Sequence, residues 1–189
     1  MPRPETELLV ELALEHSRDD AAFSLADLGT GSGAIAIALA CELKATRIAA
    51  TDNSDAALQV ARENAGRLCP GRIDFRLGDW FRPLAGEHFD MIVSNPPYVT
   101  ADDPVLRTTE LQHEPRNALA AGPDGLDHLR VLIDGARHCL NPRGRLLLEH
   151  GAGQDRALRT LLGRGGYRAI ETHTDMAGLA RITMAQWPG

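Results

Sequence analysis

The sequence of 189 residues lacks several features that would place it outside ordinary globular domains. No apolar run approaches the roughly 20 residues that a membrane-spanning helix needs, so we expect no membrane association. The amino terminus has no charged segment followed by an apolar one, so we expect no signal peptide. The three cysteines are isolated and odd in number, which favours reduced thiols in the cytoplasm over a disulfide framework.

Metal and nucleic-acid binding are also disfavoured by the composition. The seven histidines form neither an HExxH pattern nor a Cys/His ligand spacing, so no metal site is expected. The formal charge of −6 does not provide the basic surface expected of a nucleic-acid binder. With no internal repeats and no interdomain linker, the length fits a single domain over residues 1–189.

The sequence does contain an alternation of strand and helix patterns. Strands are predicted at residues 24–28, 46–51, 73–77, 89–94, 145–149, 167–173 and 179–187, and helices at 6–15, 32–43, 54–68, 126–140 and 154–163. This order predicts an α/β fold with a mostly parallel seven-stranded sheet and helices on both faces. The last two strands have no helix between them, so we expect an antiparallel hairpin at one edge. A dehydrogenase-type dinucleotide fold, which repeats its βαβ halves, has no place for that hairpin.

Two smaller features of these elements are also predicted. Thr6 is a candidate cap of the first helix, and residues 141–144 are expected to form a turn into the fifth strand. Residues 95–122 carry several prolines and are expected to form a long loop.

A glycine-rich segment, residues 27–33, joins the first strand to its helix. Glycines permit a tight turn and let a ligand approach the backbone without a clash against a Cβ atom. The segment also fits the G-x-G-x-x-G/A pattern of nucleotide binders, so the glycines alone do not identify the ligand. A plain glycine-rich connection is the alternative. The candidate cofactor-binding residues in this segment are Gly29, Thr30, Gly31, Ser32 and Gly33.

The second and third strands are followed by acidic residues. Asp52 follows the second strand, and a carboxylate there can accept hydrogen bonds from both ribose hydroxyls of an adenosine group. Asp79 and Trp80 follow the third strand, where they could bracket an adenine ring by hydrogen bonding and stacking. Alternatively, Trp80 is a residue at the edge of the hydrophobic core, which the presence of a tryptophan indicates equally well. Taken with the glycine-rich segment, these residues predict an adenosine-bearing cofactor.

Residues 95–98 read Asn-Pro-Pro-Tyr and follow the fourth strand directly. Asn95 offers one acceptor and two donors, and Tyr98 offers a flat apolar face. Pro96 and Pro97 stiffen the turn and carry no N–H, so nearby carbonyls can face a ligand. The segment therefore predicts a binding site for a planar –NH2 group, with a proline-rich turn as the alternative.

With these residues assembled, the chain resembles the class I S-adenosylmethionine-dependent methyltransferases. More narrowly, it resembles the bacterial protein-glutamine N5-methyltransferases that modify peptide chain release factors. The resemblance rests on residues 2–7, 27–33, 52, 79–80, 95–98, 114–119, 124–126 and 146–151. The segment 95–98 alone is shared with methyltransferases that act on amino groups of adenine or guanine. Residues 2–7 and 114–126 are more specific to the release-factor group.

The resemblance implies roles for individual residues. Asn95 and the Pro96 carbonyl would hold the substrate amide, and Tyr98 would pack beside it as the third catalytic residue. The cofactor, S-adenosylmethionine, with S-adenosylhomocysteine as its product, would be bound by Gly29, Thr30, Gly31, Ser32, Gly33, Asp52, Asp79, Trp80 and Asn95. The substrate would be bound by Arg3, Pro4, Asn95, Pro96, Pro97 and Tyr98, with Thr6 near the same mouth.

The expected activity is N5-methylation of the glutamine in the Gly-Gly-Gln motif of peptide chain release factors, by a cytoplasmic monomer. The release-factor enzymes carry a helical amino-terminal domain that helps to grip the substrate, and Met1 directly precedes the 2–7 segment here. We therefore expect this recognition domain to be missing. The alternatives are a methyltransferase for another protein glutamine or for a nucleic-acid amino group, and a cofactor-binding module that is inactive without that domain.

Overall fold

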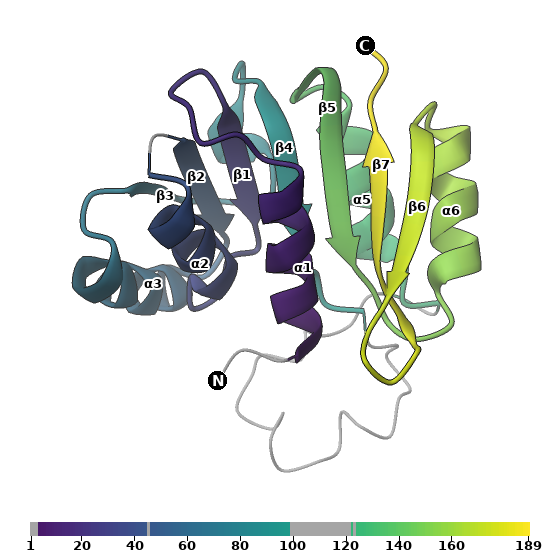
Figure 1. The fold of residues 1–189 in the computed structure, drawn as a ribbon, viewed down its shortest axis with the longest axis horizontal. Helices are drawn as coiled ribbons and strands as arrows, with labels where there is room; N and C mark the ends of the chain where they lie inside the picture. Colours follow the sequence, from purple (N-terminus) through teal and green to yellow (C-terminus); the bar gives the residue numbers. More distant parts are fainter. Residues whose placement is uncertain (1–3, 45, 99–121, 123) are drawn as a thin grey trace.

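A seven-stranded sheet forms the centre of the computed structural model, which describes residues 4–44, 46–98, 122 and 124–189 (Figure 1). Its strands are β1 (Ser24–Leu28), β2 (Arg47–Asp52), β3 (Ile73–Leu77), β4 (Phe89–Ser94), β5 (Leu140–Glu149), β6 (Arg168–Thr174) and β7 (Ala180–Gln186). Their order across the sheet is β3-β2-β1-β4-β5-β7-β6. Strands β1 to β5 pair in parallel, whereas β7 is antiparallel to both β5 and β6. The predicted mostly parallel sheet with a closing antiparallel hairpin is confirmed.

Helices cover both faces of this sheet. Those of the described chain are α1 (Pro4–Glu15), α2 (Ala34–Glu42), α3 (Asp55–Leu68), α5 (Asp127–Ala136) and α6 (Asp155–Arg164), with a short 3-10 helix η1 (Arg82–Leu84). Helices α1, α2 and α3 lie on one face, and α5 and α6 lie on the other (Figure 1). Within the described ranges, no helix has the length and apolar character needed to cross a bilayer.

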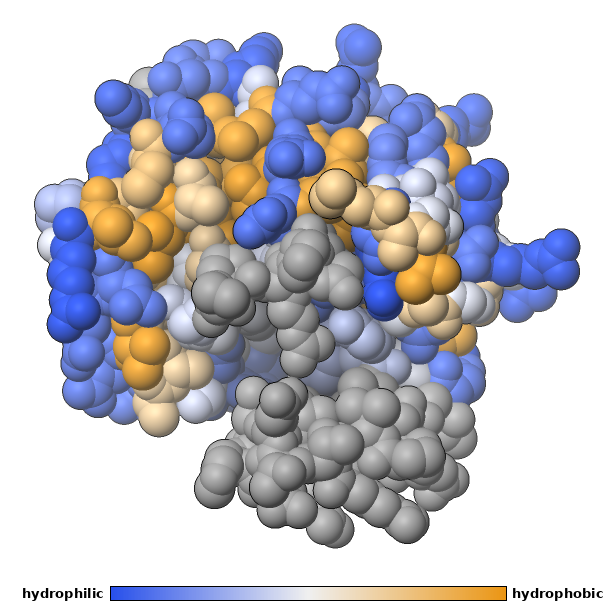
Figure 2. All heavy atoms as spheres, turned by 60° about the horizontal axis from the view of Figure 1, so that its bottom comes forward, coloured by the Kyte–Doolittle hydropathy of each residue, from blue (hydrophilic) through white to orange (hydrophobic). Residues whose placement is uncertain are grey.

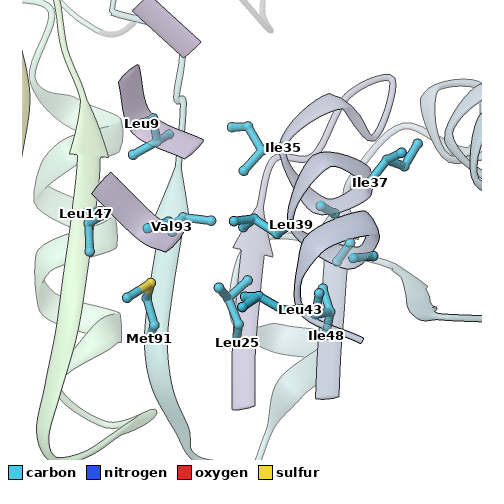
Figure 3. Packing of buried hydrophobic residues seen from close by; sticks show 14 of the residues in the cluster. Leu9, Leu25, Ile35, Ile37, Leu39, Leu43, Ile48, Met91, Val93 and Leu147 are labelled. Atoms are coloured by element: carbon cyan, nitrogen blue, oxygen red, sulfur yellow. The ribbon is translucent and has the colours of Figure 1, made fainter. Parts of the chain in front are cut away.

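Packing of α1 and α2 on the sheet fixes the position of the residues that follow the strands. Leu9 of α1, Leu39 of α2 and Val93 of β4 are fully buried and meet in one hydrophobic cluster (Figure 3). Full burial of each such aliphatic side chain stabilises the fold by about 1.5–3 kcal/mol. The cluster therefore holds the start of α2, and with it the glycine-rich segment, firmly against β1.

Strand β5 begins five residues earlier than predicted. Phe89 of β4 pairs with Leu140, and the next pairing joins Met91 to Arg145, so residues 141–144 form a bulge inside the strand. The predicted turn at these residues is therefore wrong. Apolar residues on both sides of the bulge pair with β4, while the bulge accommodates a proline that has no N–H for the ladder.

Several helix boundaries also differ from prediction, among them the start of α1 and the end of α5. Helix α1 begins at Pro4, so Thr6 lies within the first turn and is not the cap. Proline is favoured at the first helical position because that position needs no N–H. Helix α5 ends at Ala136 instead of residue 140, since Leu140 joins the sheet and pairs with Phe89.

Candidate active site at the carboxyl edge of the sheet

The parallel strands bring their carboxyl ends to one edge of the sheet, the lower edge in Figure 1. The glycine-rich segment follows β1, and Asp52 ends β2. The pair Asp79 and Trp80 comes two residues after β3, and residues 95–98 follow β4 directly. Ligands of open α/β sheets bind at this edge. Of the two other predicted substrate-binding residues, Pro4 begins α1, and Arg3 lies outside the described residues.

The glycine-rich segment needs its glycines for conformation and for space. Gly29, Gly31 and Gly33 have φ angles of 70°, 57° and 84°, in the left-handed region where a side chain is strained. The N–H groups of Gly29 and Thr30 donate to the Thr51 carbonyl at 2.9 and 3.0 Å. A Cβ atom added to Gly29 would lie 3.1 Å from Cζ3 of Trp80. The segment is thus tied to β2 and lies directly against the indole ring.

Asp52 is fixed by two backbone amides. Its Oδ2 accepts from the Gly31 N–H at 2.8 Å, and its Oδ1 accepts from the Ser54 N–H at 2.9 Å. Ser54 itself caps α3 by accepting from the Ala57 N–H, as predicted, so Asp52 is not needed as a cap. Each carboxylate oxygen keeps a second lone pair for another donor, such as a ribose hydroxyl.

A pocket of about 300 Å³ opens at the ends of β2 and β3. Its lining residues are Asn53, Leu77, Gly78, Asp79, Arg82 and Pro83. Sequence reasoning identified Asp79 but missed the polar neighbours Asn53 and Arg82. Their position along the chain could have indicated them, because Asn53 follows Asp52 directly and Arg82 comes two residues after Trp80.

Trp80 connects the glycine-rich segment to the hydrophobic core. Its ring lies 5.5 Å from the His128 ring, between centroids, at a tilt of 53°. The Trp80 carbonyl accepts from the Thr51 hydroxyl at 3.0 Å. The half-buried side chain also packs against the cluster beneath α5 and α6, and so it is an edge-of-core residue that also faces Gly29. Its stacking on an adenine ring stays a prediction.

Asp27 places a carboxylate beneath the glycine-rich segment. It is fully buried, and its Oδ2 accepts from the Thr30 hydroxyl at 2.6 Å and from the Ala36 N–H at 3.2 Å. Its buried Oδ1 has no partner in the described part of the chain. Burial raises the pKa of Asp27 to about 6, from an ordinary 3.8. A buried acceptor of this kind fits S-adenosylmethionine, whose sulfonium and ammonium groups carry positive charge.

We expect Asp27→Asn to change how stability depends on pH. Because the folded state holds the Asp27 proton up to about pH 6 and the unfolded chain loses it near pH 3.8, the wild type loses stability as pH rises between these values. The variant has no such proton, so its unfolding free energy relative to wild type should rise by up to about 3 kcal/mol between pH 4 and pH 8. Urea unfolding at both pH values measures this difference, and identical pH profiles would contradict it.

Residues 95 and 96 carry two hydrogen-bond acceptors, Oδ1 of Asn95 and the carbonyl of Pro96. The half-buried Asn95 donates from Nδ2 to the Thr6 hydroxyl oxygen at 3.3 Å. No donor within the described residues reaches Oδ1 of Asn95 or the carbonyl of the buried Pro96. The Ser94 hydroxyl donates to the Leu28 carbonyl at 2.6 Å, which ties the end of β4 to the end of β1. The two acceptors therefore lie on a turn that is fixed beside the glycine-rich segment.

Tyr98 is held by Gln154, a residue that sequence reasoning missed. Gln154 donates from Nε2 to the carbonyls of Tyr98 and Gly125 at 3.3 and 3.2 Å, and its Oε1 accepts from the Gly151 N–H at 2.8 Å. A Cβ atom on Gly151 would lie 3.1 Å from Cδ2 of Tyr98, so the half-buried ring packs closely against this glycine. No local pattern marks Gln154, because its partners come from three separate segments.

Comparison with known proteins identifies the family. Residues 4–125 match the family model described as Methyltransferase small domain. The chain is 49% identical over 189 residues to the release factor glutamine methyltransferase of Xylella fastidiosa (strain 9a5c), covering 100% of this chain and 69% of that protein. The chain belongs to the release factor glutamine methyltransferase family. A second member, from Salmonella typhimurium, is 44% identical over 187 residues, which cover 99% of this chain and 67% of that protein.

Solved structures show the same fold. TrmN from Thermus thermophilus superposes with a TM-score of 0.65 at 25% identity, over 96% of this chain and 47% of that one. A methyltransferase from Pyrococcus furiosus gives a TM-score of 0.71 at 18% identity, over 100% of this chain and 84% of that one. Together with membership of the release factor glutamine methyltransferase family, these likenesses confirm the predicted class I methyltransferase fold. The prediction of S-adenosylmethionine as cofactor is confirmed as well.

Proposed function

We propose that this chain transfers a methyl group from S-adenosylmethionine to the side-chain amide nitrogen of the glutamine in the Gly-Gly-Gln motif of a peptide chain release factor. The observation that carries the proposal is the pair of acceptors, Asn95 Oδ1 and the Pro96 carbonyl, on a fixed turn beside the glycine-rich segment. A primary amide offers two N–H groups to such a pair.

The two acceptors compensate for the poor nucleophilicity of an amide nitrogen by orienting it. Its lone pair is delocalised into the carbonyl, so its attack depends strongly on orientation. By accepting both N–H groups, Asn95 and Pro96 aim the nitrogen at the electrophilic methyl group that the cofactor supplies. Orientation of two bound reactants can contribute roughly 7–11 kcal/mol of the barrier. The same acceptors would favour the positive charge that develops on nitrogen as the C–N bond forms and the bond from the methyl group to the cofactor sulfur breaks. S-adenosylhomocysteine would be the leaving group, and the methylated nitrogen would then lose its proton to water.

We assign the cofactor to the residues around the ends of β1, β2 and β3. The buried acceptor of Asp27 and the open space beside Gly31 support a cationic adenosine compound here, and the free lone pairs of Asp52 support a bound ribose. The proposed cofactor-binding residues are Gly29, Thr30, Gly31, Ser32, Gly33, Asp52, Asp79, Trp80 and Asn95. The proposed substrate-binding residues are Arg3, Pro4, Asn95, Pro96, Pro97 and Tyr98.

A protein partner suits the surface at this edge. With the edge turned forward, hydrophobic residues lie among hydrophilic ones (Figure 2). A surface that binds nucleic acid through phosphates is dominated by basic side chains, and the net charge of the chain is −6. We therefore favour a release factor in the cytoplasm over a nucleic-acid amino group as the substrate. We also propose that residues 1–189 act as one catalytic domain, since the described strands form one sheet.

Transfer of a labelled methyl group tests the proposed function. Incubation with an intact release factor should add one methyl group to the Gly-Gly-Gln glutamine, as read by mass spectrometry of the peptide. A release factor with alanine at that glutamine is the matched control and should stay unlabelled. Label in another protein or in RNA, with the release factor unmodified, would contradict the proposal. Cofactor binding without transfer to any of these would favour an inactive binding module.

A further inference from the structure

A chain of hydrogen bonds from two distant elements ends on Asn95. The Asn95 Nδ2 donates to Oγ1 of Thr6 in α1 at 3.3 Å, and the Thr6 hydroxyl donates to Oε2 of Glu149 in β5 at 3.2 Å. Thr6 is 8% exposed and Glu149 is 1% exposed, so the hydrogen bond between them is buried, and the bond from Asn95 to Thr6 is partly buried. Sequence reasoning gave no role to Glu149, although it ends a parallel strand at the edge where the other site residues gather.

The chemistry of the three groups determines which atom donates and which accepts in each of the two hydrogen bonds. A carboxylate can only accept hydrogen bonds, so the single proton of the Thr6 hydroxyl must be directed to Glu149. The Thr6 oxygen then has only lone pairs left for Asn95. The asparagine must therefore present its –NH2 group to Thr6, which leaves its Oδ1 for another partner.

The donor role of the Asn95 –NH2 group matters because an asparagine amide can rotate by about 180° about its Cβ–Cγ bond, which exchanges Oδ1 and Nδ2 with little change in shape. In the rotated state the –NH2 group would face the substrate N–H, placing two donors against each other. Within the described residues, Thr6 is the one side chain that bonds to the Asn95 amide. Thr6 is itself held in place, because Leu9 and Ala13 anchor α1 on the sheet.

We propose that Thr6, backed by Glu149, is a positioning residue for methyl transfer: it selects the rotamer of Asn95 in which Oδ1 accepts from the substrate amide. The inference rests on the proposed function for its kinetic consequence. The hydrogen-bond chain itself is a property of the free protein and can be tested without substrate. Thr6 does not contact the reacting atoms in this scheme and acts only through Asn95.

Thr6→Val and Thr6→Ser form the decisive pair of variants. Valine keeps the shape of threonine but removes the acceptor, so kcat with an intact release factor should fall on the order of 10²-fold through misplacement of Asn95. The Kd for S-adenosylmethionine should stay unchanged. Serine restores the hydroxyl and should retain most of the wild-type kcat. Glu149→Gln should show an intermediate kcat, because a glutamine amide can also donate to Thr6, which allows the hydrogen bond from Thr6 to Asn95 to run in either direction.

Thr183→Val is the matched control for loss of a buried hydroxyl. Thr183 in β7 is fully buried and bonds to His150 and Thr172, and no hydrogen bond within the described residues connects it to Asn95. Its removal should lower stability but leave kcat within a few-fold of wild type. A similar loss of kcat in Thr183→Val and Thr6→Val would mean a general loss of packing and would overturn the positioning role. Wild-type kcat in Thr6→Val would overturn it too.

NMR of the Asn95 side chain separates this inference from the proposed function. If the wild type methylates no release factor, the proposed function fails. The side-chain –NH2 signals of Asn95 in the free protein still report on the hydrogen bonds that join Asn95, Thr6 and Glu149. Thr6→Val should shift these proton signals and speed their exchange with water, whereas Thr6→Ser should leave both nearly unchanged. Unchanged Asn95 signals in Thr6→Val would overturn the inference.

Discussion

Asn95→Ala should lower the rate of methyl transfer about 10²–10³-fold, the range typical for loss of one preorganised hydrogen-bonding group at a reacting centre. The variant loses the Oδ1 acceptor and keeps the Pro96 carbonyl, so a substrate amide would be held by one N–H instead of two. The Kd for S-adenosylmethionine should change much less than the rate, because the other eight proposed cofactor-binding residues remain and Asp52 stays bonded to Gly31 in the glycine-rich segment. Single-turnover transfer to a release factor, together with calorimetry of cofactor binding, measures the two effects.

Asn141→Ala provides a matched control for the loss of an asparagine amide. Asn141 also donates a side-chain hydrogen bond, to Asp90 at 3.0 Å, but it lies in the bulge near the start of β5, away from the carboxyl edge. Its replacement should leave the rate of transfer near that of the wild type. Equal activity of Asn95→Ala and wild type would show that Asn95 does not hold the substrate. A loss of cofactor affinity as large as the loss in rate would assign it to the cofactor instead.

The strands and helices could be predicted because local patterns determine them. Ile73, Phe75 and Leu77 alternate with polar residues and form β3, and the capping by Ser54 fixed the start of α3. The positions of the candidate site residues followed from one rule, since carboxyl ends of parallel strands share an edge. The error at residues 141–144 arose because proline and glycine also occur at bulges, where pairing with β4 resumes after them.

The hydrogen-bond partners of the site could not be predicted in the same way. Thr6 and Glu149 are 143 residues apart, and only the packing of α1 on the sheet brings them together. As a residue near a helix start, Thr6 resembled a cap in the sequence, but its hydroxyl instead bonds to β5. Gln154 bonds to Tyr98, Gly125 and Gly151, partners that no spacing along the chain reveals. The rule about strand ends could have indicated Glu149 but not its partner.

Gly29→Ala should weaken the binding of S-adenosylmethionine at least about tenfold, or about 1.4 kcal/mol. At a φ of 70° the alanine is strained by about 1–2 kcal/mol, and its Cβ would lie 3.1 Å from Cζ3 of Trp80. The indole ring or the glycine-rich segment must then move by a few tenths of an ångström. Either movement displaces the surface proposed to hold the adenosine group. Calorimetry gives the affinity, and urea unfolding gives the cost in stability.

Gly71→Ala separates the effect of backbone strain at a positive φ from the effect of the contact between residue 29 and Trp80. Gly71 has nearly the same φ, 71°, but nothing lies within 4 Å of its added Cβ, and it precedes β3 at the opposite edge from the site. The two variants should therefore lose similar stability from backbone strain, about 1–2 kcal/mol, while only Gly29→Ala loses affinity. If both variants bind the cofactor as the wild type does, the contact between Gly29 and Trp80 lies outside the cofactor site. If both lose affinity equally, the effect comes from stability and not from the shape of the glycine-rich segment.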